Sequence, residues 1–575
     1  YGGRISSVIE LTSRNGNSLS PHGSVYGNLM SQGLTGELPI LSRGNWIFNI
    51  RSSTTSSFQT ELYRSIQDYV TGDDNFNLIG ESANSEKNQK SIYLPQFSYF
   101  DFTNHFSYMA TPNHRFTFTN TTGRDSIQEN REFYGFSNFL LFDSFYTEGI
   151  TELKNNGSAF NLSSHWNHES NTQFSFSNYT YESAYDSKSS AEKNTELLSL
   201  GSIHEKNYLE DKSLKFHHLY KGSENHIIES GIDETFYQVQ FNNRKTDGLD
   251  SNESFIEQKG FLHSFYLQDQ WTPSRNWTIQ TGLRMSYYSE RMGFYTSPRI
   301  SVINKMLSNI TLEASMGKQV QFIHQLVGDK TTRGTQGMWV LSTDNIPNTA
   351  SVNTHFGLNW DFGDYSLNNE FYHRNMIDLV KFGESTIPIV AMNKKDASES
   401  PLIYQGNGTA SGIELLLRKR NGWVTGWLSY QKNKTEYTFP SLNEGKPFLE
   451  DHDKSQEFKS VLMTHLGQWE ITGNWVWATG HVYTVPENVF VVNRKIVIPS
   501  NQNNARVEPI HHLDISVSRS WVIYTAKIHF GLSVYNLYNR KNISHKKYNP
   551  YTPELTATDV IMFGITPTLI LKVSF

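Results

Sequence analysis

Few residues of this chain combine the types and the spacing that covalent or metal chemistry needs. A histidine precedes a carboxylate at His204-Glu205, and histidine pairs occur at His217-His218 and His511-His512. The first lacks the second histidine that a zinc-binding H-E-x-x-H motif requires. If the two pairs lie on strands, adjacent side chains point to opposite faces, so neither pair can chelate one ion as a unit.

The acidic residues Asp451, Asp453 and Glu457 are the best set of oxygen ligands for Ca²⁺. A solvated acidic loop accounts for the same residues without a metal, and we favour that interpretation. We find no G-x-S-x-G elbow and no P-loop. The sequence therefore predicts a protein that is not an enzyme and that needs no cofactor and no resident metal ion.

The composition narrows the function classes further. The net charge of -6 gives no support for a nucleic-acid partner, and the absence of cysteine excludes a disulfide framework and a thiol nucleophile. Aromatic residues reach 14% and charged residues only 18%. No Pro- or Ser-rich linker interrupts the 575 residues. One large repetitive architecture is thus a better interpretation than several soluble domains.

The elements that such a chain builds are strands of alternating character. No apolar run approaches the roughly 18 residues that a spanning helix needs, and the mean hydropathy is -0.53. A membrane β-barrel has this low average because only alternate residues face lipid. A soluble all-β protein is the alternative. Alternating runs occur at 25–30, 46–51, 97–109, 160–166, 174–181, 265–271, 277–287, 356–362 and 365–372.

Two hairpins show the pattern most clearly. In the first, Ile413 opposes Glu414 and Arg418, and Asn421-Gly422 supplies the positive φ angles of a tight turn. In the second, Trp469 to Ala478 returns after Gly467-Gln468, with tryptophans opposite polar residues. The inward polar set would hydrate a lumen, hydrogen-bond a plug or contact a substrate, and comprises Glu414, Arg418, Glu470, Asn474, Asp514 and Lys572.

Strands of about 9 to 14 residues suit a tilted bilayer crossing. Short turns alternate with long polar connections, which we predict at 72–90, 186–194, 247–258 and 435–455. This alternation is typical of outer-membrane barrels, with short turns in the periplasm and long loops outside. At about 25 residues per strand and connection the chain makes about 22 strands, and a lumen of that size is closed by a plug.

Aromatic residues near strand ends indicate an interfacial girdle, for example Tyr287-Tyr288, Tyr372, Trp423 and Tyr430. Ordinary strand propensity is the alternative explanation. The last strand alternates Leu571, Val573 and Phe575 with polar residues. We predict that these three form the signal that an outer-membrane protein presents to its assembly machinery.

Short motifs in a specific order carry a family resemblance. Tyr1-Gly2-Gly3-Arg4 begins the chain, and the later motifs are Thr122-Asp125, Tyr266-Trp271 with Thr281-Arg284, Ser297-Ser301, Ser411-Leu415 with Gly426-Tyr430, Leu513-Ser516 and Tyr535-Asn542. With these motifs the chain resembles the TonB-dependent outer-membrane receptors, in particular the Bacteroidota type with a carboxypeptidase-regulatory-like N-terminal domain. One departure is Asp451 to Glu457, where many relatives carry a Tyr-Asp-basic-basic-His-Asp run.

The resemblance implies a domain plan and a function. Residues 1–19 would be the C-terminal end of a plug with its linker, Tyr1 to Arg4 would mark the junction, and residues 20–575 would form an all-β transmembrane barrel. Since the chain has no initiator Met and no signal peptide, we expect that it is part of a longer protein, with the TonB box and most of the plug outside it.

The implied activity is uptake of a bulky nutrient such as siderophore-bound iron, a cobalamin-like compound or a glycan. The implied partners are outer-membrane lipid, the TonB complex through the missing N-terminal region, and a surface lipoprotein. The alternative is a divergent barrel that serves as a structural or channel subunit of a larger outer-membrane complex. We expect the chain alone to form an open pore.

Overall fold

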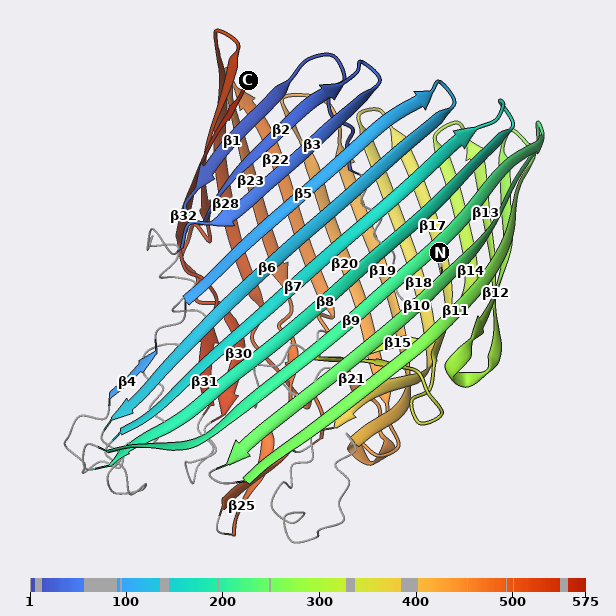
Figure 1. Cartoon of the computed structure of the whole chain (residues 1–575). Helices are drawn as coiled ribbons and strands as arrows, with labels where there is room; N and C mark the ends of the chain where they lie inside the picture. The colour runs from blue at the N-terminus through green and yellow to red at the C-terminus, as the bar shows by residue number, and fades with distance from the viewer. Residues whose placement is uncertain are drawn as a thin grey trace.

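The computed structural model describes residues 2–5, 13–55, 90–93, 96–134, 144–193, 196–247, 250–326, 337–383, 402–451, 453–492, 494–499, 501–548 and 557–575. Strands dominate these residues (Figure 1). The described part also contains the 3-10 helices η1 (Ser289–Arg291) and η3 (Asn443–Gly445). None of its helices is long enough and apolar enough to cross a membrane.

Twenty-two strands form one closed antiparallel barrel, as the sequence predicted. Each strand pairs with its neighbour along the chain, and β1 closes the ring on β32 with Val25 opposite Val573. The barrel strands are β1 (His22–Asn28), β2 (Ser31–Ile40), β3 (Gly44–Ser53), β5 (Gln96–Thr111), β6 (His114–Tyr134), β7 (Ser144–His165), β8 (Ser170–Lys193), β9 (Glu196–Ser223), β10 (His226–Asp247), β11 (Asp250–Ser274), β12 (Trp277–Tyr288), β13 (Gly293–Leu307), β14 (Ile310–Gln321), β17 (Thr349–Phe362), β18 (Tyr365–Gly383), β19 (Leu402–Lys419), β20 (Val424–Thr438), β22 (Gln456–Leu466), β23 (Trp469–Ala478), β28 (Ile510–Ile523), β29 (Ala526–Tyr535) and β32 (Thr566–Ser574).

In the described residues, ten shorter strands lie toward one end of the barrel. Two of them, β4 (Lys90–Tyr93) and β21 (Phe448–Leu449), add to the edge of the main sheet through β6 and β20. The others pair within the long connections, as β15 (Ile323–Leu326) with β16 (Met338–Leu341), β24 (Val482–Tyr483) with β27 (Ala505–Arg506), β25 (Pro486–Val492) with β26 (Arg494–Pro499), and β30 (Ile543–Tyr548) with β31 (Ala557–Ile561).

The two ends of the barrel differ. At the upper end in Figure 1, here the short-turn end, neighbouring strands join through a few residues. Gly363, Gly422 and Gly467 lie in these turns with φ of 58°, 110° and 62°, a region that costs glycine little. The other end, here the long-loop end, carries the long connections. The predicted alternation of short and long connections is therefore correct.

The predicted lengths of strands and loops are wrong on one side of the barrel. Strands β6 to β11 contain 21 to 28 residues, not 9 to 14. Residues 186–193 and 250–258, predicted as loops, continue β8 and β11. The motif Thr122-Asp125, which resembles a strand end of the family, lies inside β6. The predicted loop 72–90 lies almost entirely outside the described residues. Strand pairing persists beyond the apolar zone, where the alternation that marks a strand in sequence disappears.

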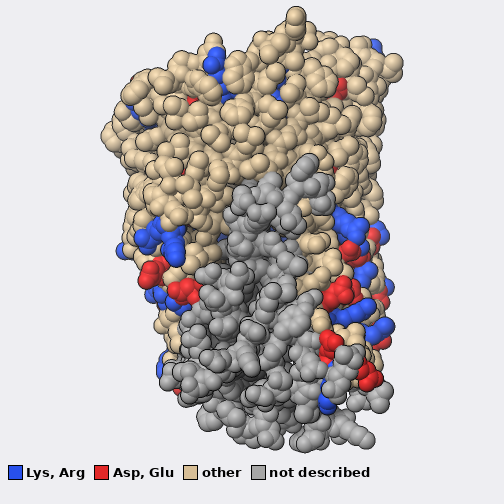
Figure 2. All heavy atoms as spheres, turned by 90° about the vertical axis from the view of Figure 1, so that its left-hand side faces the viewer, with Lys and Arg blue, Asp and Glu red and all other residues tan. Residues whose placement is uncertain are grey.

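The outer face of this tall wall changes character along its height. Figure 2 views the barrel from the left-hand side of Figure 1, and there most charged side chains lie in the half toward the long-loop end and few lie in the other half. Lys154 Nζ lies 3.2 Å from Glu182 Oε1, and Lys206 Nζ lies 2.9 Å from Glu182 Oε2. Arg124 pairs with Glu152 on the same face. The apolar half is the part that can contact hydrocarbon.

Candidate functional site: the barrel lumen

The inner face of the barrel is polar because side chains alternate across each strand. Ile413 and Trp475 on β19 and β23 are exposed on the outer face, and Leu571 on β32 is exposed there too. Their sequence neighbours therefore face the lumen. The structure places all of the predicted lumen residues on this inner face, namely Glu414, Arg418, Glu470, Asn474, Asp514 and Lys572.

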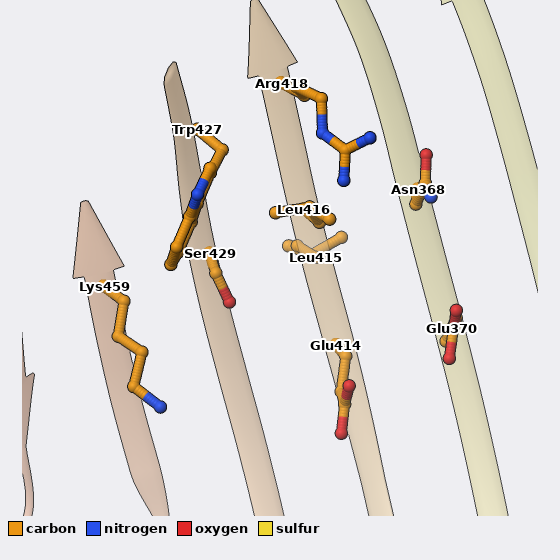
Figure 3. Close-up of a pocket in the computed structure, with 9 residues that line it drawn as sticks. All are labelled: Asn368, Glu370, Glu414, Leu415, Leu416, Arg418, Trp427, Ser429 and Lys459. Atoms are coloured by element: carbon orange, nitrogen blue, oxygen red, sulfur yellow. The ribbon is translucent and has the colours of Figure 1, made fainter. Parts of the chain in front are cut away.

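A groove in the inner wall collects charges of both signs. It spans β18, β19, β20 and β22 and has a volume of about 370 Å³ (Figure 3). Glu370 and Glu414 are register partners on neighbouring strands. Figure 3 shows Lys459, Ser429 and Trp427 reaching the same groove from the other two strands. Sequence analysis predicted Glu414 and Arg418 as lumen residues. It missed Glu370 and Lys459, although these two also lie at inward positions of alternating strands.

The groove can bind through charge-assisted hydrogen bonds. Glu370 already lies 3.5 Å from His355 Nε2, and Lys459 Nζ lies 2.7 Å from Glu457 Oε2. Paired carboxylates suit an ammonium or guanidinium group, while lysine and arginine suit carboxylate or phosphate. The indole of Trp427 adds a flat apolar surface. The groove fits a ligand or a protein segment that carries both polar and planar groups.

The hairpin of β15 and β16 folds against the inner wall near the long-loop end. The backbone N–H of Trp339 donates to Asn207 Oδ1 at 3.1 Å, and that of Leu341 donates to Gln258 Oε1 at 2.8 Å. Phe322 packs on Tyr288 with ring centroids 4.9 Å apart. Sequence reasoning missed this hairpin, because its apolar residues form no period that separates it from a barrel strand.

A buried histidine lies inside this hairpin. His324 is 6% exposed, and its Nε2 lies 3.0 Å from Ser342 Oγ. Burial lowers the pKa of His324 to about 4, since desolvation disfavours the charged imidazole and nearby Arg4 repels it. The ring is therefore neutral at neutral pH.

The N-terminal residues contact one wall of the lumen. Gly3 bridges to Gln321 at the end of β14, and the backbone N–H of Ile5 donates to Gln321 Oε1 at 3.3 Å. A Cβ atom at Gly2 would lie 2.5 Å from Arg284 Nε, so a larger residue there would force the guanidinium to move. Of the four predicted junction residues, Tyr1 lies outside the described residues.

Residues slightly further along the chain contact the opposite wall. Arg14 pairs with Glu37 on β2, the N–H of Asn17 also donates to Glu37, and the N–H of Gly16 donates to Asn45 Oδ1 on β3 at 2.9 Å. In barrel order β2 is the second strand and β14 the thirteenth, so eleven steps of a 22-strand ring separate them. Residues 2–5 and 13–17 are thus anchored across the lumen from each other.

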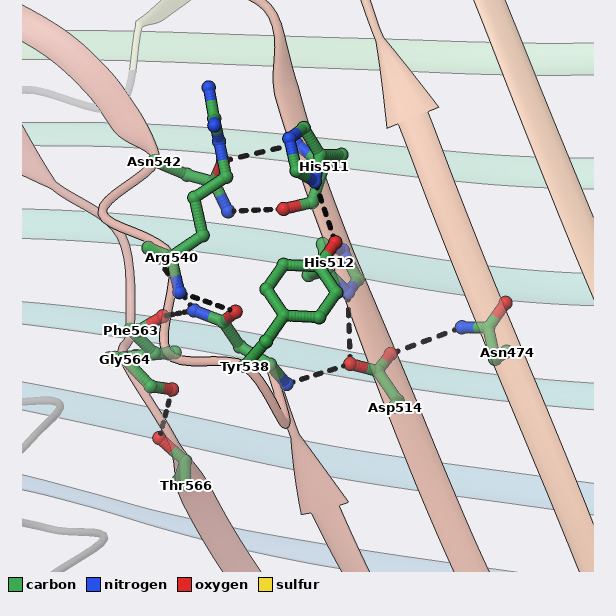
Figure 4. Close-up of polar contacts among 11 residues, drawn as sticks. Asn474, His511, His512, Asp514, Tyr538, Arg540, Asn542, Phe563, Gly564 and Thr566 are labelled. Carbon is green, nitrogen blue, oxygen red and sulfur yellow. Dashed lines mark hydrogen bonds and ion pairs between the residues drawn. The ribbon is translucent and has the colours of Figure 1, made fainter.

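An asparagine-rich turn supports the lumen wall between β29 and β32 (Figure 4). Asn536 is fully buried, and its Nδ2 donates to the carbonyls of Arg540 and Phe563 at 2.8 and 3.0 Å. The N–H of Asn536 donates to Asp514 Oδ1 at 2.9 Å. Asn542 exchanges two hydrogen bonds with the backbone of His511. The motif Tyr535-Asn542 thereby gains a structural explanation.

The predicted metal and acidic candidates are engaged in protein contacts. His217 Nδ1 lies 2.7 Å from Tyr266 Oη, while His218 Nδ1 lies 3.0 Å from Thr172 Oγ1 on the opposite face. Asp453 pairs with Arg506 at 2.7 Å and Glu457 with Lys459. In the described ranges, no three histidine or carboxylate groups come together as a metal site.

The prediction of an aromatic girdle is correct for some of the named residues and wrong for others. Trp423 is 78% exposed at the short-turn end, as an interfacial residue should be. Tyr288 is fully buried in the lumen cluster, and Tyr372 lies on the inner face beside Gly412. Both were predicted for the girdle, because sequence spacing alone does not tell which face of a strand meets lipid.

Comparisons with known proteins agree with this architecture. The chain superposes on the siderophore receptor PirA from Acinetobacter baumannii (TM-score 0.61, 11% identity, covering 98% of this chain and 81% of that one). It also superposes on the ferric yersiniabactin uptake receptor FyuA from Yersinia pestis (0.62, 9%, 98% and 81%) and on the outer membrane transporter YddB from Escherichia coli (0.61, 8%, 96% and 80%). A search of curated proteins found no match.

The sequence itself gives the assignment. The family described as "TonB dependent receptor-like, beta-barrel" matches residues 44–537, which is most of the chain. Barrels of this family are integral to the outer membrane, and the structural neighbours are receptors and transporters. Their short turns face the periplasm and their long loops face outward. The chain belongs to the TonB-dependent receptor β-barrel family.

Proposed function

We propose that this barrel is the wall of an active importer for a bulky nutrient. The observation that carries the proposal is the N-terminal segment anchored across the lumen, by Gly3 on Gln321 and by Arg14 on Glu37. In this proposal residues 1–19 end a plug that the preceding part of the protein supplies, and Tyr1 to Arg4 mark the junction. The TonB complex pulls on that plug and opens the path.

The substrate classes are siderophore-bound iron, a cobalamin-like compound or a glycan. The siderophore receptors among the structural neighbours support the first class. The charged groove of Glu370, Glu414, Arg418 and Lys459 with Trp427 supports a polar ligand with planar parts. A surface lipoprotein would add contacts at the long-loop end.

The direct test is energy-dependent uptake. The full-length gene is expressed in matched strains with and without TonB, and cells receive a labelled ferric siderophore, a cobalamin or an oligosaccharide in separate experiments. We expect accumulation of one of them in the strain with TonB and none above background without it. Equal accumulation of every probe in both strains, or of none of them in either strain, would overturn the proposal.

The tall outer wall favours a second candidate, a subunit of a larger outer-membrane complex. Strands β6 to β11 are far longer than the roughly 9 to 11 residues that cross a bilayer. Their outward charges, including Lys154, Glu182 and Lys206, offer a surface to another protein. Purification in mild detergent decides this candidate, which fails if the barrel is recovered alone.

A further inference from the structure

Arg519 lies beside a pair of tryptophans on the outer face of the barrel. Val517 on β28 pairs with Leu532, which is 44% exposed on the outer face, so Arg519 two residues later also points outward. It is the register partner of Trp469, the first residue of β23. The guanidinium carbon lies 5.3 Å from the ring centroid of Trp469 and 5.1 Å from that of Trp521.

The depth of Arg519 is that of the periplasmic membrane interface. The turns at Gly467-Gln468 and Tyr524-Thr525 close this side of β23 and β28. Side chains around them are strongly exposed and apolar on the outer face and in the turn: Leu466 at 65%, Ile523 at 51% and Tyr524 at 98%. Trp and Tyr prefer the level of the lipid headgroups. The cation therefore sits where hydrocarbon gives way to phosphates.

The hydrogen-bonding capacity of Arg519 is only partly used by the protein. Its Nη2 donates to Gln468 Oε1 at 2.6 Å. Its Nε is buried and has no hydrogen-bond partner. A guanidinium has five donors, and a buried unpaired donor is costly. The two indoles contact the guanidinium by cation–π interaction. Gln468 takes one bond from Nη2, so the remaining Nη1 and Nη2 hydrogens are the donors that an anion would use.

We propose that Arg519, Trp469 and Trp521 form a binding site for the phosphate of a phospholipid in the periplasmic leaflet. A phosphate accepts two parallel N–H bonds from one guanidinium, which a lysine at this position would not supply. The acyl chains of that lipid would lie along the outward row that continues into the membrane from Arg519. Charge complementarity and the interfacial depth both favour this occupant over a protein partner.

Lys419 provides an internal comparison. It faces outward at the same end of the barrel, and its Nζ lies 5.9 Å from the ring centroid of Tyr365, its register partner. Among the described residues one ring accompanies it, and its flexible stem reaches water on its own. We therefore expect Lys419 to add general attraction for anionic lipid without holding one molecule.

Native mass spectrometry of the purified protein tests the site. The sample is loaded with phosphatidylglycerol, or in parallel with phosphate-free diacylglycerol, and then stripped with detergent. We expect the wild type to retain one phosphatidylglycerol per barrel and no diacylglycerol. R519Q should lower phosphatidylglycerol occupancy at least about tenfold, which corresponds to the loss of one charge-assisted bond. K419Q should match the wild type.

Folding is checked by heat-modifiable electrophoretic mobility, so a variant that fails to fold is recognised. R519K keeps the charge and provides the second variant, and we expect it to retain lipid less often than the wild type. Equal retention by the wild type, R519Q and R519K would overturn the proposal. Equal retention of diacylglycerol and phosphatidylglycerol by the wild type would overturn it as well.

Discussion

Asn536 and Asn539 lie three residues apart with φ of 51° and 55°, so both occupy the left-handed region that asparagine tolerates well. They differ in burial: Asn536 is fully buried, whereas Asn539 is exposed and accepts one bond, from the N–H of Ile565. This pair separates the cost of backbone strain from the cost of lost buried hydrogen bonds.

We predict that N536A destabilises the connection between β29 and β32 by about 2 to 4 kcal/mol, because the backbone groups of Arg540 and Phe563 lose their partner. N539A should cost about 1 kcal/mol or less, since water replaces its single bond. Hydrogen exchange of the connection in refolded protein measures both. Equal effects would mean that backbone strain and not burial dominates.

At the scale of elements, the β15–β16 hairpin should respond to pH through His324. Its pKa is about 4 in the folded protein, below the unfolded value near 6.5. Between these values the opened hairpin binds a proton and the packed one does not. The hairpin is therefore fully packed above about pH 6.5 and loses up to about 3 kcal/mol as the pH falls toward 4.

Limited proteolysis or hydrogen exchange of residues 322–326 and 337–341 at pH 7 and pH 4.5 measures this effect. H324Q keeps a polar group near Ser342 Oγ and cannot be charged, so its packing should vary less with pH. H373Q, on a histidine of strand β18, serves as the control. An unchanged pH response in H324Q would place the titrating group elsewhere.

A substitution in the closing strand β32 can distinguish an effect on assembly in cells from an effect on stability. Phe575 exchanges two backbone hydrogen bonds of 2.9 Å with Gly23, but its ring is 61% exposed. F575A keeps the backbone pairing, so we expect refolding in detergent to be nearly unchanged. As Leu571, Val573 and Phe575 are our proposed assembly signal, the same variant should insert several-fold less protein in cells. F294A, also at an exposed outward phenylalanine, is the control. Normal insertion of F575A would remove the terminal ring from the signal.

The strands and the groove differ in how well the sequence predicted them. Alternation located the parts of β17 to β20 nearest the short-turn end, because lipid and water impose opposite demands on neighbouring side chains such as Ile413 and Glu414. It failed for the parts of β8 and β11 nearest the long-loop end, where both faces meet water. The groove was half predicted through Glu414 and Arg418. The position of Glu414 opposite Glu370 depends on the register between β18 and β19, which a single sequence does not show.

At the scale of the whole molecule, the barrel width decides how a polypeptide of residues 1–575 behaves by itself. A 22-strand lumen is too wide for wall side chains to fill. The β15–β16 hairpin lies against the inner wall at β9 to β11 and at β18. Residues 2–5 and 13–17 add contacts on opposite sides of the lumen. We therefore predict large, poorly selective conductance in planar bilayers.

The conductance of residues 1–575 can be compared with that of a polypeptide of residues 20–575. Removing residues 1–19 should raise the conductance by less than about twofold, because so short a segment fills a small part of so wide a lumen. The conductance of R14Q should lie between those of the two polypeptides, since this variant loses only the ion pair with Glu37. A silent trace from residues 1–575 that stays silent after removal of residues 1–19 would contradict the open-pore prediction and assign closure to the long-loop end. A silent trace that opens on removal would make the segment itself the gate, which is the stronger form of the proposed plug junction.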